Sequence, residues 1–127
     1  MPISTPYNRL PSFSTVSGNS IMTGYVQVGD DAAAPLIKTK TLTGTTSDTQ
    51  GGAVSIAHGI SNPSKILLLW TQVEYATDVW INENYEALSG YQFGVYTTDT
   101  NIVVANVDPN SGSILQKPIK IFIIYKE

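Results

Sequence analysis

The sequence predicts an all-β protein: an antiparallel β-sandwich of jelly-roll type, preceded by an extended N-terminal arm. First, 37 of the 127 residues are Val, Ile or Thr, whose β-branched side chains suit strands better than helices. Second, no window of ten residues or more places its apolar residues at helical spacing, and heptads are absent. Third, short apolar runs alternate with clusters of turn residues, at the spacing expected of a sandwich or barrel.

The arm is predicted over residues 1–35, which hold four of the seven prolines. Proline fixes φ and removes a backbone donor, so this spacing favours an extended segment over a helix or a central strand. Apolar side chains interrupt the polar ones, and Tyr7, Leu10 and Phe13 are the candidates for anchoring the arm in a groove or sheet edge of another protein. A disordered terminus is the alternative.

The head is predicted over residues 36–127 as a succession of short strands. Each strand is a run of apolar or β-branched residues that ends at a cluster of turn-forming residues. The run at 53–57 alternates cleanly, with Val54 and Ile56 on one face. The connecting loops and turns are expected at residues 43–52, 59–64, 98–100 and 108–113. The predicted strands are residues 36–42, 53–57, 65–75, 85–88, 91–97, 101–107 and 119–125.

Two of these strands are apolar on both faces. Residues 66–70 read Ile-Leu-Leu-Leu-Trp, and in the last strand Phe122 and Ile124 make the second face apolar as well. A strand with two apolar faces has to be covered on both sides. In a head this small, a symmetric homo-oligomer covers the second face economically. Leu68, Trp70, Phe122 and Ile124 are therefore the predicted oligomer interface.

The residue types that catalysis requires are sparse. His58 is the one histidine, and no G-x-S-x-G elbow accompanies it, so a structural role at the end of a strand is expected. The carboxylates lie mostly in turns, where Asp is common for turn geometry alone. The sequence therefore predicts no catalytic residue, no cofactor and no enzymatic activity.

One oxygen-rich segment is the best candidate for a metal site. Asp78, Asn82, Glu83, Asn84 and Glu86 lie within nine residues and carry the oxygen ligands that Ca²⁺ prefers. Their spacing matches no twelve-residue calcium loop, and a chain without cysteine has no thiolate zinc ligands. A solvated loop is therefore expected, and no metal site is predicted.

Two aromatic residues flank the same polar segment. Trp80 and Tyr85 offer ring faces on which sugars can stack, and a low-charge surface rich in Asn and Thr suits neutral glycans. Aromatic residues in alternating strands otherwise belong to a core or a subunit interface. Trp80 and Tyr85 are thus the candidate ligand-binding residues, with packing as the alternative.

Charge and hydropathy argue against two further classes of protein. The seven basic residues are scattered and are outnumbered by ten acidic ones, so the basic cluster that nucleic acid requires is missing. The longest apolar run has five residues, far fewer than the ~20 of a membrane-spanning helix. The first six residues show neither a basic leader nor an apolar stretch, so no Sec signal is expected.

Several segments resemble the small β-sandwich heads of tailed-phage fibre and capsid-fibre proteins. They are residues 40–46 (KTLTGTT), 51–60 (GGAVSIAHGI) and 65–67 (KIL), while 101–104 (NIVV) with 117–125 (KPIKIFIIY) is similar to the last two strands of such heads. The resemblance implies a trimeric knob on the virion that attaches to host surfaces or decorates the shell. Since the chain has no shaft and only a short arm, it favours a capsid-attached head fibre or decoration protein.

The same resemblance implies the partners and the location. The expected partners are copies of the chain in a trimer and, through the arm, the major capsid protein or another fibre protein. The implied location is the capsid surface of the virion, after synthesis in the cytoplasm of the bacterial host. A tail-associated knob that recognises cell-surface glycans is the alternative. Neither nucleic acid nor membrane insertion is expected.

Overall fold

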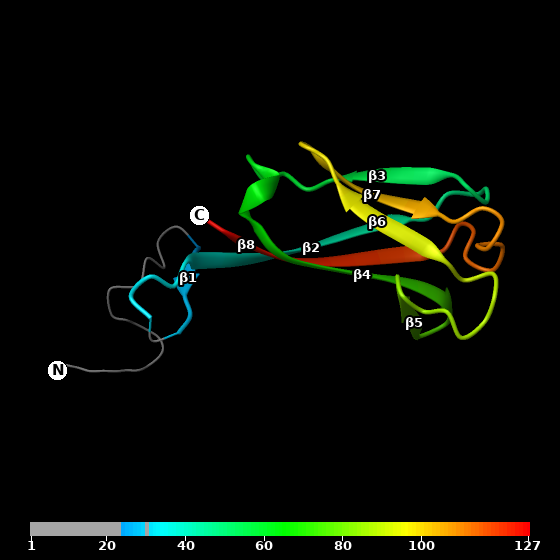
Figure 1. The fold of residues 1–127 in the computed structure, drawn as a ribbon, viewed down its shortest axis with the longest axis horizontal. Helices are drawn as coiled ribbons and strands as arrows, with labels where there is room; N and C mark the ends of the chain where they lie inside the picture. The colour runs from blue at the N-terminus through cyan, green and yellow to red at the C-terminus, as the bar shows by residue number, and fades with distance from the viewer. Residues whose placement is uncertain (1–23, 30) are drawn as a thin grey trace. The chain divides into compact units, whose positions relative to one another are not determined.

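The computed structural model describes residues 24–29 and 31–127, which form eight β-strands and one short 3-10 helix, η2 (Figure 1). This confirms the predicted all-β class. No helix within these ranges is long and apolar enough to cross a membrane. The elements are β1 (Val26–Gln27), β2 (Leu36–Thr45), β3 (Ala53–Ala57), η2 (Pro63–Lys65), β4 (Ile66–Ala76), β5 (Val79–Asn82), β6 (Phe93–Thr97), β7 (Asn101–Asn106) and β8 (Pro118–Lys126).

The chain divides into two compact units. One comprises the residues up to Lys38 together with Tyr125–Glu127, and the other comprises Thr39–Ile124. The predicted boundary between arm and head, after residue 35, stays a prediction.

Main-chain pairing and an aromatic contact hold the first unit together. β1 pairs antiparallel with the start of β2, so that Val26 lies opposite Ile37. Tyr25 and Tyr125 pack edge to face, with ring centroids 6.0 Å apart. The side chain of Gln27 donates a 2.8 Å hydrogen bond to the carbonyl of Ala34, which ties β1 to the segment before β2.

Two antiparallel sheets build the fold, with strand orders β1-β2-β8-β4-β5 and β3-β7-β6. In Figure 1 the strands β3, β7 and β6 form a layer above β2, β8 and β4. Val73 of β4 lies opposite Ile81 of β5, and β5 covers only the C-terminal half of β4. In the smaller sheet, Val104 of β7 lies between Val54 of β3 and Val95 of β6.

Alternating side chains of the central strands fill the space between the two layers. Ile119, Ile121 and Ile123 of β8 are at most 1% exposed, whereas the residues between them face the other way. Each such burial stabilises the fold by roughly 1.5–3 kcal/mol. β2 and β3 approach closely, because a Cβ atom at Gly44 would lie 2.7 Å from Cδ1 of Ile56. The core thus lies between the sheets of the second unit.

Most of the predicted strands are confirmed to within a few residues. The predicted strand at 85–88 is wrong, because these residues form an irregular segment. Tyr85 donates its N–H to the carbonyl of Asn82, which closes a turn directly after β5. β5 was not predicted, and it pairs with β4 through a turn in which Asp78 adopts a φ of 62°. The predicted loop at 43–52 begins later than expected, since β2 extends to Thr45.

Candidate functional site

A patch of exposed apolar side chains lies on the outer face of the five-stranded sheet. Leu68 and Trp70 of β4 are 45% and 48% exposed, and Phe122 of β8 is 40% exposed, with Ile124 half-buried beside it. They share this face because they alternate with the buried Thr71 and Val73 of β4 and with the buried isoleucines of β8, and β4 and β8 are neighbours. The structure thus brings the four predicted interface residues together, in what we call the apolar patch.

Strand β2, which lies next to β8 in the sheet, borders this patch. Gly44 faces the core, so the positions that alternate with it on β2 face outward. From residue 39 to residue 45 these positions are all threonines, and all are exposed: Thr39, Thr41, Thr43 and Thr45. The patch is therefore a delimited apolar area beside a polar stripe, as in a protein interface.

Trp80 adjoins the same face through a cation–π contact. The ammonium group of Lys120 lies 4.2 Å from the centroid of the Trp80 ring. Lys120 belongs to β8 and Trp80 to β5, so the lysine reaches across β4. This contact occupies one of the two faces of the indole.

The two predicted ligand-binding residues share one depression. Trp80 and Tyr85 both line a cavity of about 450 Å³ next to β5, together with Tyr75, Asn84 and Glu86 among others. Aromatic faces beside amide and carboxylate groups are the combination that a sugar ring needs. The structure therefore brings Trp80 and Tyr85 to the same depression, while their role in ligand binding stays a prediction.

The tyrosines of this depression are held by a third ring. Tyr91 packs edge to face against Tyr75 and against Tyr85, with centroid distances of 4.9 Å and 6.0 Å. The sequence placed Tyr91 in a predicted strand and among the aromatic residues that could stack on a sugar, but did not select it as a ligand-binding residue; in the structure it precedes β6. The cluster keeps Tyr85 in place although no strand carries it.

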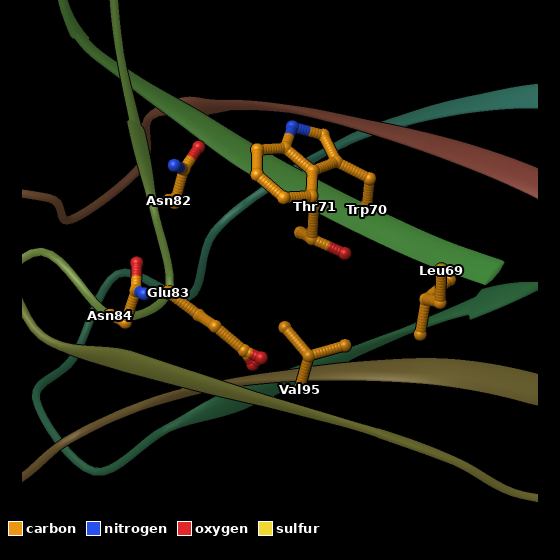
Figure 2. Close-up of a pocket in the computed structure, with 7 residues that line it drawn as sticks. All are labelled: Leu69, Trp70, Thr71, Asn82, Glu83, Asn84 and Val95. Carbon is orange, nitrogen blue, oxygen red and sulfur yellow. The ribbon is translucent and has the colours of Figure 1, made fainter.

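A second cavity, of about 340 Å³, opens where β5 leaves β4 (Figure 2). We call it the edge notch. Thr71 lies there with only 7% of its surface exposed, and its Oγ1 has no hydrogen-bond partner among the described residues. Figure 2 shows its side chain pointing into the space bounded by Glu83 and Val95. The residues that line the notch are Leu69, Trp70, Thr71, Asn82, Glu83, Asn84 and Val95.

Sequence reasoning missed Thr71 as part of a site. The available signal was a hydroxyl directly after an apolar run of five residues. A buried hydroxyl without a partner carries a desolvation cost, so such a group indicates either strain or a missing ligand.

His58 has the structural role that its place at the end of a strand predicts. It is 1% exposed, and its Nδ1 accepts a 3.0 Å hydrogen bond from the N–H of Ile60. A nitrogen that accepts is unprotonated, so the neutral ring carries its proton on Nε2, which donates to the carbonyl of Thr98 at 3.1 Å. The Lys40 ammonium donates to the His58 carbonyl at 2.6 Å. Both ring nitrogens are therefore engaged in holding two turns together.

The carboxylates of the oxygen-rich segment do not converge. Glu83 lines the edge notch and Glu86 the depression, while the carboxylate of Glu74 accepts the N–H of Asp78 at 2.8 Å. The amide of Asn82 accepts from Gln72 at 3.0 Å. Within residues 24–29 and 31–127, no three His, Cys, Asp or Glu side chains group as metal ligands.

Three predicted anchoring residues, Tyr7, Leu10 and Phe13, lie outside the described residues. The chain matches no described protein family, and no curated protein or solved structure is significantly similar to it.

Proposed function

We propose that the chain is a structural virion protein of the phage head-fibre or decoration kind, in which copies of the head associate through the apolar patch. The patch is the observation that carries the proposal. Leu68, Trp70 and Phe122 expose large apolar surface side by side on neighbouring strands, and contiguous patches of this kind mark protein interfaces.

The proposal has three finer features. In it, the two antiparallel layers belong to a β-sandwich of jelly-roll type, an architecture that viral shell proteins use for display. Three copies place their apolar patches around a common axis, since cyclic symmetry repeats one interface until the ring closes. The arm then joins the head to the major capsid protein or to another fibre protein. Sequence resemblance to phage heads supports the location on the capsid surface.

Light scattering of the full chain tests the self-association. The double variant Trp70→Ser with Phe122→Ser removes apolar area from the patch without touching the core, so we expect the oligomer to dissociate at micromolar concentration. Tyr96→Ser is the matched control, because Tyr96 is 57% exposed on β6 of the other sheet. A monomeric wild-type chain, or a double variant as oligomeric as the control, contradicts the proposal.

Imaging of intact particles tests the location. Gold particles bound through a tag at Glu127 are expected on the capsid shell. Label on the tail only favours the tail-associated alternative, and unlabelled particles contradict a virion role altogether.

Glycan recognition by a tail-associated knob is the second candidate function. It is favoured by one observation, the convergence of Trp80 and Tyr85 in the same depression. A glycan array should then show binding that Trp80→Ala and Tyr85→Ala each weaken. Leu88→Ala, at a 56% exposed position outside the lining, is the control. Binding that survives the loss of both aromatic residues rules out this site.

A further inference from the structure

The edge notch adjoins a length of main chain that no described strand covers. β4 runs from Ile66 to Ala76, but β5 pairs with it only from Gln72 onward. β8 lies on the other side of β4. Residues 66–71 therefore direct one row of N–H and C=O groups toward the notch side, where the described part of the chain supplies no strand. Such an edge is a template for one more strand.

The composition of this edge favours pairing. Natural edge strands are usually protected by charges, prolines or bulges. Residues 66–71 contain no charged residue, no Pro and no Gly. Leu67 and Leu68 are 49% and 45% exposed. A strand of this kind needs a partner to cover it.

The notch gives the missing strand a place for its inward side chains. Leu69 and Val95 supply apolar walls, and Thr71 supplies a buried hydroxyl to which the described part of the chain offers no hydrogen-bond partner. A polar group on an added strand would satisfy Thr71. Glu83 places a carboxylate at the end of the notch where β5 departs.

We propose that this edge binds residues 12–17 of the N-terminal segment of a second copy, as an added strand of the five-stranded sheet. The proposal rests on the proposed self-association and names the segment that completes it. Twenty-three residues precede the described part of the chain, and Ser12–Ser17 is a stretch without proline that follows Pro11. Its six residues equal the six uncovered residues of β4. Phe13 supplies an apolar side chain small enough for a cavity of about 340 Å³.

Charge supports the same segment as the occupant. Arg9 is the one charged side chain in residues 1–29, and it stands three residues before Ser12. Glu83 offers the opposite charge at the notch. An arginine opposite a carboxylate fixes the direction and register of an added strand.

Disulfide trapping tests the proposal on the full-length chain, which has no native cysteine. One copy carries Thr15→Cys, on the same face of the added strand as Phe13, together with a mass tag, and the other carries Leu67→Cys without a tag. After mixing and mild oxidation, we expect a disulfide between tagged and untagged copies. The control pairs Thr15→Cys with Asp48→Cys, because Asp48 is exposed in the loop between β2 and β3. The control should give only background cross-linking.

The outcomes separate this proposal from the proposed function. Arm-to-edge cross-links between copies support it. If cross-links form only within single chains that carry both cysteines, the bound segment comes from the same chain, and the proposal of a second copy is wrong. Background yield together with an oligomer in light scattering overturns the arm as occupant but leaves self-association intact. A monomer overturns both.

A charge exchange tests the register. Glu83→Arg places like charges together and should lower the cross-linking yield about two- to fivefold, the effect expected of an exposed ion pair. Adding Arg9→Glu to the tagged copy should restore the yield. Glu86→Arg is the matched control, since Glu86 is exposed and lines the other cavity. Equal yields for Glu83→Arg and Glu86→Arg overturn the pairing of Arg9 with Glu83.

Discussion

The hydroxyl of Thr46 donates a 2.6 Å hydrogen bond to the carbonyl of Ile114, which lies 68 residues further along the chain. The same hydroxyl accepts the N–H of Lys117 at 2.8 Å. One buried side chain thereby satisfies two main-chain groups of the loop before β8. Thr71 is the opposite case, because its hydroxyl is buried with no hydrogen-bond partner in residues 24–29 and 31–127. The two threonines therefore predict opposite results for the same substitution.

Thr46→Val should destabilise the protein by about 2–3 kcal/mol, because it keeps the side-chain shape but leaves a carbonyl and an N–H unpaired. The midpoint of urea denaturation measures the loss. Thr46→Ser retains the hydroxyl and should recover most of the stability. Equal losses for the Val and Ser variants would show that packing of the methyl group, rather than hydrogen bonding, matters at this position.

Thr71→Val should leave the stability unchanged or raise it by about 0.5–1 kcal/mol, because it removes a buried polar atom that has no partner among the described residues. The same denaturation experiment applies. In the trapping experiment, however, this variant should lower the yield of arm-to-edge disulfide, since the added strand loses its buried polar contact. If Thr71→Val destabilises the protein as much as Thr46→Val does, the Thr71 hydroxyl has a hydrogen-bond partner and this interpretation is wrong.

The strand pattern of the second unit was predictable because local residue preferences and alternation agree there. Val54 and Ile56 define one face of β3, and the alternating isoleucines of β8 define the core. Leu68, Trp70, Phe122 and Ile124 were predicted as one surface for the same reason. When a strand is apolar on both faces, the core covers only one of them, and the other apolar face stays on the surface.

The edge notch was not predictable from those rules. It exists because β5 ends at Asn82, and strand ends are decided by turns such as the one between Asn82 and Tyr85. The segment at 85–88 opens with Tyr85, a residue that favours strands, but it follows this turn, and Tyr85 packs against Tyr91 instead of joining a sheet. Tertiary contacts overrule local preference at this point.

Two glycines in neighbouring layers should respond differently to the same change. At Gly44 a Cβ atom would lie 2.7 Å from Cδ1 of Ile56, so Gly44→Ala should cost about 1–3 kcal/mol by overpacking. At Gly94 nothing lies within 4 Å of the added atom, so Gly94→Ala should be neutral or slightly stabilising. Thermal denaturation compares the two. Ile56→Val removes the obstructing methyl group and should reduce the additional cost of Gly44→Ala. If Gly44→Ala costs as much in the Ile56→Val background as in the wild type, the strain does not come from the contact with Ile56.

His58→Phe should destabilise the protein by about 2–4 kcal/mol, because a ring of similar size fills the site but leaves the N–H of Ile60 and the carbonyl of Thr98 unpaired. His58→Asn should recover part of this loss, since the side-chain oxygen of an asparagine can accept an N–H two residues further on. Urea denaturation ranks the variants, and Asp99→Ala, at an exposed position of the adjoining hairpin, is the control and should change little. The trapping experiment adds a second readout, because the turn that His58 fixes leads through η2 into the edge of β4. If His58 positions that edge, His58→Phe lowers the yield of arm-to-edge disulfide even at temperatures where the chain is fully folded. Full stability of His58→Phe would mean that water replaces the ring nitrogens as partners.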